Sequence, residues 1–143
     1  MSIELGLRAL LLGQSGITSI AVPRVIGQKQ YQAVYNEFPA QGHTPPFVVI
    51  EEIEYDPMKC LDGTTGMAKT EIDVDCYAKT VDTAIALREA VDRYLKDYTG
   101  AAGPDDTIRA VLLNGHSNDT IAMGDGTDNR LHVRGSSFLI FHV

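Results

Sequence analysis

The chain lacks any apolar run approaching the roughly 20 residues that a membrane-spanning helix needs. No basic residue precedes Leu5 at the N-terminus. These two absences argue against a membrane anchor and a secretory signal peptide, so we expect a cytosolic product. Only two cysteines are present, Cys60 near a predicted turn and Cys76 in a predicted strand. We expect both to be free thiols, because a reducing cytosol disfavours disulfides.

Positive charge is also scarce. The chain has 12 Lys and Arg against 19 Asp and Glu, a net charge of -7 at pH 7. A general nucleic-acid binder needs basic surface to displace counterions from phosphates, so this composition argues against that class. It remains compatible with a protein that DNA slides past. At 143 residues, with 44% apolar and 22% charged residues, the chain fits a single globular domain over residues 1–143 whose core needs no disulfides.

Hydrophobic periodicity and turn residues predict the order of the secondary-structure elements. Ser2 is a candidate cap for a first helix, and Gly13 and Gly16 are expected to end it. Asp56-Pro57 is expected to stop the first long strand. The first half of the chain is predicted to form a helix over 3–12, an extended piece over 20–26, and a long loop over 27–46 with a brief strand at 33–35. Two strands over 47–55 and 67–79 follow, and then a helix that is capped by Thr80 and ends before Gly100. The remainder is predicted to form a strand over 107–113, a loop or loose hairpin over 114–129, and a final strand over 131–143.

Alternation along the predicted strands separates two faces, because successive side chains of a strand point in opposite directions. In the first long strand, one face is predicted to hold Phe47, Val49, Glu51, Ile53 and Tyr55. In the second strand, the core face is predicted to hold Ile72, Val74, Cys76 and Ala78, and the other face Glu71, Asp73, Asp75 and Tyr77. Glu52 and Glu54 are candidates to lie opposite these acids, and we interpret the acidic row as a solvated face.

The helix after Thr80 has one apolar stripe, formed by Ala84, Leu87, Val91, Tyr94 and Tyr98 at spacings of three and four. On its solvated side, Glu89 with Arg93 and Asp92 with Lys96 are placed to form i,i+4 ion pairs. Because hairpins dominate the element order, the predicted fold class is α+β. We expect a mainly antiparallel sheet of about four to six strands with two helices packed on one face.

None of the candidate catalytic or metal motifs is complete. Gly13-Gln14-Ser15-Gly16 resembles a nucleophile elbow, but Ile17 occupies the position of the second glycine and a helix precedes the motif. The four histidines (His43, His116, His132 and His142) show no ligand spacing, and we interpret them as surface or strand-face residues. Asp119, Asp125 and Asp128 lack the spacing of a calcium loop and fit ordinary turns. No cofactor, metal or catalytic residue is predicted.

Several segments, taken in order, resemble the tail-completion or tail-terminator family of long-tailed bacteriophages. The resemblance covers residues 3–143. The matching features are the leucine-rich opening helix (3–12), Arg24-Val25, Val34-Tyr35, Pro39-Ala40-Gln41-Gly42 before Pro46-Phe47-Val48-Val49-Ile50, the Gly63 to Gly66 turn, the strand 72–78, the helix with Ala84, Leu87, Ala90 and Val91, and the closing strand 137–142.

This resemblance implies a virion structural protein without catalytic chemistry. Such a protein caps the tail tube as an oligomeric ring, commonly a hexamer, ends tube growth and forms the tail side of the head–tail joint. Its implied partners are copies of itself, the major tail-tube protein, a connector or stopper protein, and genomic DNA that passes through without sequence-specific binding. The implied location is the virion tail, after assembly in the bacterial cytoplasm.

Two groups of residues are candidates for subunit contacts and for the DNA channel. Arg24, Tyr31, Tyr35 and Phe38 lie in or beside the long loop over 27–46, which we expect to order and dock when subunits assemble. Glu71, Asp73 and Asp75 are candidates to line the channel, because like charge keeps DNA from adhering. Two alternatives stay open from sequence: another head–tail connector or stopper, and a small-molecule-binding or enzymatic α+β domain.

Overall fold

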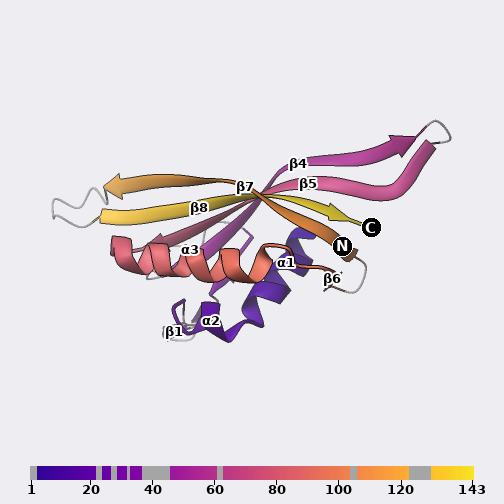
Figure 1. The fold of residues 1–143 in the computed structure, drawn as a ribbon. Coiled ribbons are helices and arrows are strands. Elements are labelled where there is room, and N and C mark those ends of the chain that lie inside the picture. The colour runs from indigo at the N-terminus through magenta and orange to yellow at the C-terminus, as the bar shows by residue number, and fades with distance from the viewer. Residues whose placement is uncertain are drawn as a thin grey trace.

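Six strands form a curled, mostly antiparallel sheet around which the molecule is organised (Figure 1). The computed structural model describes residues 3–21, 24–26, 29–31, 33–36, 46–60, 63–103, 106–122 and 130–143. The elements in chain order are α1 (Ile3–Leu12), α2 (Ser15–Thr18), β1 (Arg24–Ile26), β2 (Lys29–Tyr31), β3 (Val34–Tyr35), β4 (Phe47–Cys60), β5 (Gly63–Ala78), α3 (Val81–Leu95), β6 (Gly100–Ala102), β7 (Asp106–Ala122) and β8 (Arg130–His142). The α+β class is therefore confirmed.

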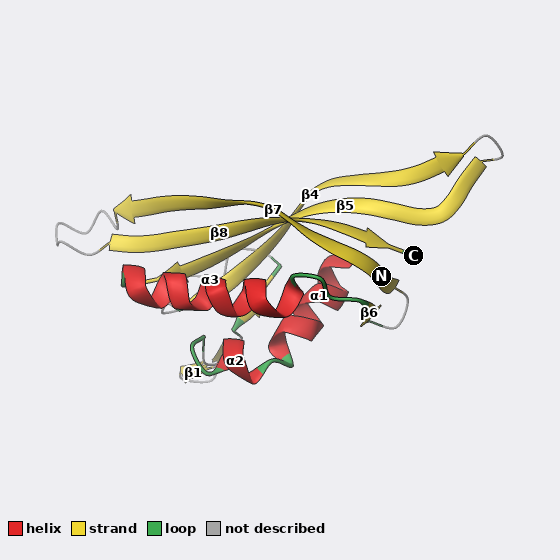
Figure 2. Ribbon diagram, in the orientation of Figure 1, coloured by secondary structure: helices red, strands yellow, loops and turns green. Residues whose placement is uncertain are grey.

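The strand order in the large sheet is β3-β4-β5-β8-β7-β6, and only the β3–β4 pair is parallel. Strands β1 and β2 form a separate two-stranded ribbon. Two long hairpins dominate: β4–β5 and β7–β8 extend toward opposite ends of the sheet as two arms (Figures 1 and 2). Central pairing of β5 with β8, from Ala68 opposite His142 to Ala78 opposite His132, joins the two hairpins.

Helix α3 forms where sequence periodicity predicts it. Thr80 caps its start, because the Thr80 hydroxyl oxygen accepts a hydrogen bond from the Thr83 amide at 3.3 Å. The stripe residues Ala84, Leu87 and Val91 are buried, and α3 packs against β5 and β8. The predicted core face of β5 is confirmed, since Ile72, Val74, Cys76 and Ala78 are all buried.

Helix α1 packs against β3, β4 and β6. Its residues Ile3, Leu7 and Leu11 recur every four positions and are buried. Gly6 faces the backbone of Ala102 in β6 so closely that a Cβ atom at position 6 would overlap the Ala102 carbonyl. The three helices lie on the lower side of the sheet in the view of Figure 1. The sequence predicted two helices, and the short α2 is the addition.

Gly13 and Gly16 were both expected to end the first helix. Gly13 does follow the end of α1, but Gly16 lies inside α2. Ile17 explains the second helical turn: its side chain is buried in the same core as Leu7 and Leu11. Tertiary burial therefore outweighs the weak local preference of one glycine.

The strands are longer than predicted, and Pro57 does not stop β4. The strand passes through Pro57 to Cys60, with a register shift between Pro57 and Lys59. A proline lacks the N–H that a ladder needs, but it is tolerated at a bulge and on an edge strand. Strand β4 is such an edge here, because β3 pairs only with Val48 and Val49.

Residues 114–129 were predicted as a loop or loose hairpin. The loop alternative is wrong for residues 114–122, which continue β7 into a hairpin with β8. Asn114, Gly115, Ser117 and Asn118 have turn-like composition, yet residues 115–122 pair in sequence with β8 down to Ala122 opposite Arg130. Here, pairing with β8 outweighs the low intrinsic strand propensity of these residues. Residues 123–129, which include Asp125 and Asp128, lie outside the described residues.

We expect Gly6→Ala to lower the free energy of unfolding by about 1–3 kcal/mol, because the added methyl group meets fixed backbone of β6. Gly16→Ala is the matched control, since nothing lies within 4 Å of a Cβ atom there. Helix propensity predicts that this control gains up to about 1 kcal/mol. Urea unfolding followed by circular dichroism measures both, and equal effects would contradict the close packing of α1 on β6.

Candidate functional site

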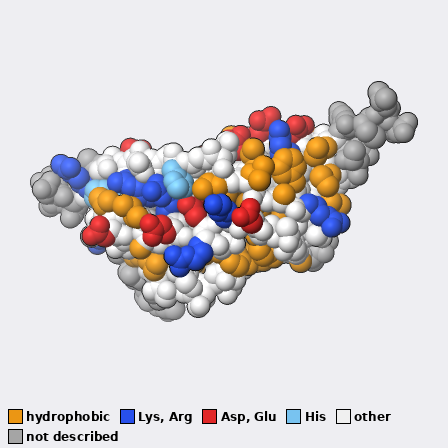
Figure 3. All heavy atoms as spheres, in the orientation of Figure 1, with side chains coloured by type: hydrophobic (Ala, Val, Ile, Leu, Met, Phe, Trp, Pro, Cys, Tyr) orange, Lys and Arg blue, Asp and Glu red, His pale blue; other side chains and the backbone are white. Residues whose placement is uncertain are grey.

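An acidic face covers the β4–β5 half of the sheet on the side opposite the buried Ile72 and Val74. In the ladder, Glu71 lies opposite Glu54 and Asp73 lies opposite Glu51. We call these four residues with Asp75 the acidic face. Figure 3 shows acidic side chains gathered along the upper edge near the β4–β5 arm. Like charges directly opposite each other are unfavourable, so this arrangement is a cost that folding alone does not explain.

A bulge decides which glutamates join this face. The register shifts by one residue between Glu52 and Glu54. Glu51 and Glu54 therefore both lie on the acidic face, whereas Glu52 lies opposite the buried Ile72. The expectation that Glu52 joins the acids is wrong, and so is the placement of Tyr55 on the same face as Phe47. Alternation over the whole strand fails because one extra residue reverses every later side chain.

Asp75 is the member of the acidic face whose carboxylate is perturbed by burial. Burial raises its pKa to about 6, and the neighbouring charges of Asp73 and Glu51 add to the rise. Gly135 of β8 makes room for it: a Cβ atom at position 135 would overlap the Asp75 carboxylate and lie 2.6 Å from the Ser117 hydroxyl. The fully solvated face predicted from sequence is therefore wrong at Asp75, whose carboxylate sits over the sheet.

The residues predicted to contact partners are only partly described. Tyr35 is partly exposed, and its ring packs edge-on against Phe47 at 6.1 Å. Phe47 in turn stacks on Tyr77 at 5.1 Å. Arg24 lies in β1 and Tyr31 in β2, but their side chains are outside the described part of the chain, as is the whole of Phe38. The predicted docking of the loop over 27–46 therefore stays a prediction.

Both long edge strands leave part of their backbone without a strand partner in the described part of the chain. On β4, β3 pairs at Val48 and Val49, and the Glu4 carboxylate accepts a hydrogen bond from the Glu52 amide at 2.6 Å. On β7, β6 pairs as far as Ile108, and the Asp97 amide donates to the Val111 carbonyl at 3.4 Å. Farther along β7, the Asp119 carbonyl accepts a hydrogen bond from Arg134 and the Thr120 amide donates to the Asp119 side chain. The segments between these contacts are 53–57 of β4 and 112–118 of β7, and we call them the two open edges.

Large apolar side chains concentrate on these same strands. Among the described residues, seven large apolar side chains are exposed, and five of them belong to β4 or β7. They are Ile53, Tyr55 and Met58 on β4 and Leu112 and Ile121 on β7; the other two are Leu5 and Val143. Exposed edges with apolar side chains are templates for pairing with another chain. The sequence alone does not place these edges, because the bulges that shape them depend on pairing.

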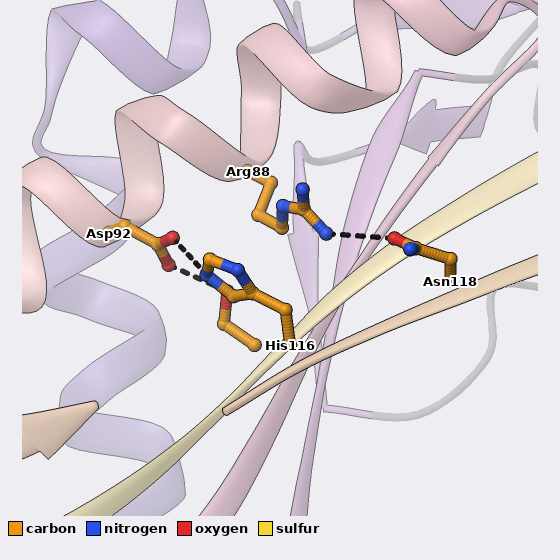
Figure 4. Close-up of polar contacts among 5 residues, drawn as sticks. Arg88, Asp92, His116 and Asn118 are labelled. Carbon is orange, nitrogen blue, oxygen red and sulfur yellow. Dashed lines mark hydrogen bonds and ion pairs between the residues drawn. The ribbon is translucent and has the colours of Figure 1, made fainter. Parts of the chain in front are cut away.

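A polar cluster clamps α3 to the β7–β8 arm (Figure 4). The Asp92 carboxylate accepts hydrogen bonds from His116 Nε2 at 2.7 Å and from the Ser136 hydroxyl at 2.6 Å. One turn earlier in α3, Arg88 donates to the Asn118 side-chain oxygen at 2.9 Å. Asp92 was predicted to lie on the solvated side beside Lys96, and this is wrong. Sequence spacing within one helix cannot reveal a strand that crosses it.

A second polar network lies inside the sheet at the end of β8. His142 is buried and joins three strands: its Nε2 lies 2.7 Å from the Thr70 hydroxyl of β5, and its Nδ1 lies 3.4 Å from Asp106 Oδ1 of β7. Among the described residues, the other Asp106 oxygen is buried without a hydrogen-bond partner. Because Thr70 is fully buried, this arrangement links three strands inside the sheet.

The remaining candidate is an open groove between α2 and α3, of about 470 Å³. Its walls are formed by Ile17 and Ile20 on one side and by Ala90, Arg93 and Tyr94 on the other. Within the described residues, no cluster of three or more His, Cys, Asp or Glu side chains could hold a metal ion, and no helix is long and apolar enough to cross a membrane. Cys76 is a free, buried cysteine.

Comparison with known proteins finds structural likenesses but no match by sequence. No protein-family model matches the chain, and no curated protein sequence matches it. The fold is similar to a chain in a solved structure described as "Virion of native gene transfer agent (GTA) particle". The TM-score is 0.64 at 11% sequence identity, and the alignment covers 96% of this chain and 93% of that chain. At this identity the likeness shows a shared fold across nearly the whole domain.

The raised pKa of Asp75 leads to a pH-dependent prediction. A carboxyl whose pKa is higher in the folded than in the unfolded chain destabilises the fold as pH rises from its ordinary value of 3.8 to about 6. Asp75→Asn should therefore raise the free energy of unfolding at pH 7.5 by about 1 kcal/mol, a value reduced for partial solvent exposure. Below pH 4 we expect little difference. Urea unfolding at both pH values tests this, with Glu89→Gln, at an exposed position on α3 away from the acidic face, as control.

We expect Asp92→Ala to lower the free energy of unfolding by about 1–3 kcal/mol, because it removes two hydrogen bonds and leaves the Ser136 hydroxyl unpaired. Glu89→Ala, an exposed position one turn earlier in α3, should change stability by no more than about 0.5 kcal/mol. The His116 imidazole resonances in NMR should shift only in the Asp92 variant. Unchanged His116 signals there would contradict the clamp.

Proposed function

We propose that this protein is a structural component of a phage-like virion and that it works by association rather than by catalysis. The observation that carries this proposal is the shared fold with a chain of a gene transfer agent virion over nearly the full length of both. Fold alone does not imply function. Support therefore also comes from surfaces that suit assembly: an uncovered acidic face and two open edges that expose apolar side chains.

The finer proposal is a cap on the tail tube, which the family resemblance of the sequence favours. Copies of the chain form a closed ring, commonly of six subunits, that ends tube growth and meets a connector or stopper protein at the head–tail joint. A ring needs heterologous contacts, in which two different surfaces of the same protein meet. The two open edges lie on opposite sides of the sheet and belong to different strands, so they meet this requirement.

The acidic face is proposed to line the central channel. Glu71, Asp73 and Asp75 project from one strand with Glu51 and Glu54 beside them, and the unfavourable closeness of these charges is understandable if function requires it. DNA phosphates are repelled by such a surface, so the polymer can move through without adhering. In this proposal the major tail-tube protein and the connector contact the two rims of the ring.

Two other functions remain as competitors. A connector or stopper protein would share the virion setting and ring symmetry, and only its position in the particle would differ. A small-molecule-binding domain is favoured by one observation, the groove between α2 and α3, whose volume of about 470 Å³ falls within the usual range for ligand sites. The groove accounts for neither the acidic face nor the open edges.

Assembly state and DNA retention test the proposal together. We expect light scattering and negative-stain electron microscopy of the purified protein to show closed rings with a central opening. These rings should not retain double-stranded DNA in a gel-shift assay at low salt. Glu71→Lys combined with Asp73→Lys should leave the rings intact and make them retain DNA, with retention lost as salt rises.

The matched control reverses charge elsewhere: Asp82→Lys with Glu89→Lys, two exposed positions on α3. These rings should behave like the parent. Equal DNA retention by both double variants would contradict the assignment of the acidic face to the channel. A protein that stays monomeric and binds a small molecule in the α2–α3 groove would contradict the proposed ring. Gold-labelled protein located within virions would separate a tail cap from a connector.

A further inference from the structure

A group of hydrogen-bond donors lies on the helix-facing side of the β7–β8 arm. In the ladder, Asn118 lies opposite Arg134 and Thr120 lies opposite His132. On its other side, Arg134 lies opposite Cys76 of β5, which is buried on the core face. Because alternate residues of a strand share a face and directly opposed residues of neighbouring strands do so too, all four donors lie on this side of the sheet.

Two guanidinium groups meet here without a carboxylate partner. Arg88 of α3 points toward the arm, and its Nη1 donates a hydrogen bond to the Asn118 side-chain oxygen at 2.9 Å (Figure 4). Arg134 Nη1 donates to the backbone carbonyls of Val133 at 3.0 Å and Asp119 at 3.3 Å. Within the described residues, neither guanidinium group forms an ion pair with an Asp or Glu side chain. Since each guanidinium carries five N–H donors, most of these donors stay available to an acceptor from outside.

The nearest carboxylates do not neutralise this pair of arginines. One turn farther along α3, the two Asp92 oxygens are bonded to His116 and to Ser136. Asp119 is the strand neighbour of the donor Thr120, so its side chain leaves β7 on the opposite face. It accepts a hydrogen bond from the Thr120 amide at 2.8 Å. The positive charge on the helix-facing side is therefore left for another group to balance.

Uncharged donors complete the group. The Asn118 oxygen accepts from Arg88, so the Asn118 amide nitrogen is directed elsewhere with its two N–H groups. His132 Nδ1 is buried and has no hydrogen-bond partner among the described residues, and such an atom calls for an explanation. Figure 3 shows basic and histidine side chains gathered over the β7–β8 half at its left. We call Arg88, Asn118, Thr120, His132 and Arg134 the basic cluster.

We propose that the basic cluster is a docking site for the carboxylate side chains of an acidic segment in another virion protein. This inference rests on the proposed role in a virion and specifies one contact within it. A guanidinium group matches the two oxygens of a carboxylate with parallel hydrogen bonds. Two such groups from different elements, both adjoining Asn118, can hold neighbouring carboxylates of one segment.

The distribution of charge favours protein carboxylates over DNA phosphates as the occupant. Duplex DNA is bound by a row of cations spread along its backbone. The basic cluster instead concentrates two arginines around one asparagine, in a chain whose net charge is -7. The acidic face lies on the reverse side of the same sheet and repels a long polyanion. A short acidic segment reaches the basic cluster without crossing that face.

Titration with a model acidic peptide tests the site. The probe is a short blocked peptide of alternating Glu and Ser, and its counterpart has Gln in place of Glu. In proton–nitrogen correlation NMR spectra at low salt, the Glu peptide should shift the side-chain Nε–H signals of Arg88 and Arg134, and the Gln peptide should not. Arg88→Gln combined with Arg134→Gln should weaken binding about tenfold or more, because charge-assisted hydrogen bonds are lost.

A second variant fills the site and keeps both arginines. Thr120→Asp places a carboxylate opposite His132, where it should compete with the peptide and weaken binding about tenfold. Thr107→Asp adds the same charge at an exposed position near the other end of β7 and should leave binding unchanged. Arg93→Gln combined with Arg109→Gln removes two other exposed arginines and is the matched control for the arginine variant.

The controls decide whether the effect belongs to the basic cluster. Equal weakening by the designed and the control variants would reduce the effect to net charge and overturn the proposal. Retention of double-stranded DNA that depends on Arg88 and Arg134, without binding of the Glu peptide, would overturn it in favour of a phosphate site. Thermal unfolding monitored by circular dichroism shows which variants keep the fold, and Thr120→Asp decides the question if the double arginine variant does not.

Electron microscopy of the same samples separates this proposal from the function on which it rests. Rings that do not bind the Glu peptide would overturn the docking site and leave the ring cap standing. A protein that binds the peptide through the basic cluster but forms no rings would support the docking site and contradict the cap. Rings that come apart in the folded Arg88→Gln, Arg134→Gln variant would place the basic cluster between copies of this chain and overturn its assignment to another protein.

Discussion

The antiparallel pairing of β5 with β8 is the constraint on which the rest of the structure depends. It joins two hairpins that are otherwise local, and it fixes which side chains face the helices. Ile72 and Phe138 lie directly opposite each other in this ladder and are fully buried. The alternation of a strand then carries Glu71, Asp73 and Asp75 to the other face. The core and the acidic face are therefore two consequences of one register.

Small departures from regular pairing shape the surfaces that we assign to assembly. The bulge after Glu52 brings Glu54 onto the acidic face and turns Tyr55 away from it. Gly135 leaves space over β8 that the Asp75 carboxylate fills, and the reduced solvation raises the pKa of this group to about 6. Each feature costs stability in an isolated chain. Such costs are expected at functional surfaces, where a protein gives up stability for its task.

On both long outer strands, part of the backbone is hydrogen-bonded to other elements and part is not. Glu4 and Asp97 occupy backbone positions of β4 and β7 nearest the body of the protein. Beyond them, both strands continue as arms that expose apolar side chains. A monomeric protein usually blocks such edges with charge, proline or covering elements. The β4 arm carries such devices, since Glu54, Asp56, Pro57 and two register shifts lie on it.

The sequence by itself determined the class of fold, the helix α3 with its Thr80 cap, the buried row of β5 and the last strand, because each depends on local periodicity. It also determined the acidic character of the chain. Only the tertiary structure decided where β4 and β7 end, that Glu51 and not Glu52 joins the acids, and that Asp92 bonds to His116 and Ser136. These features depend on bulges and on contacts between residues far apart in sequence, and a one-residue shift of register, invisible in composition, reverses a face.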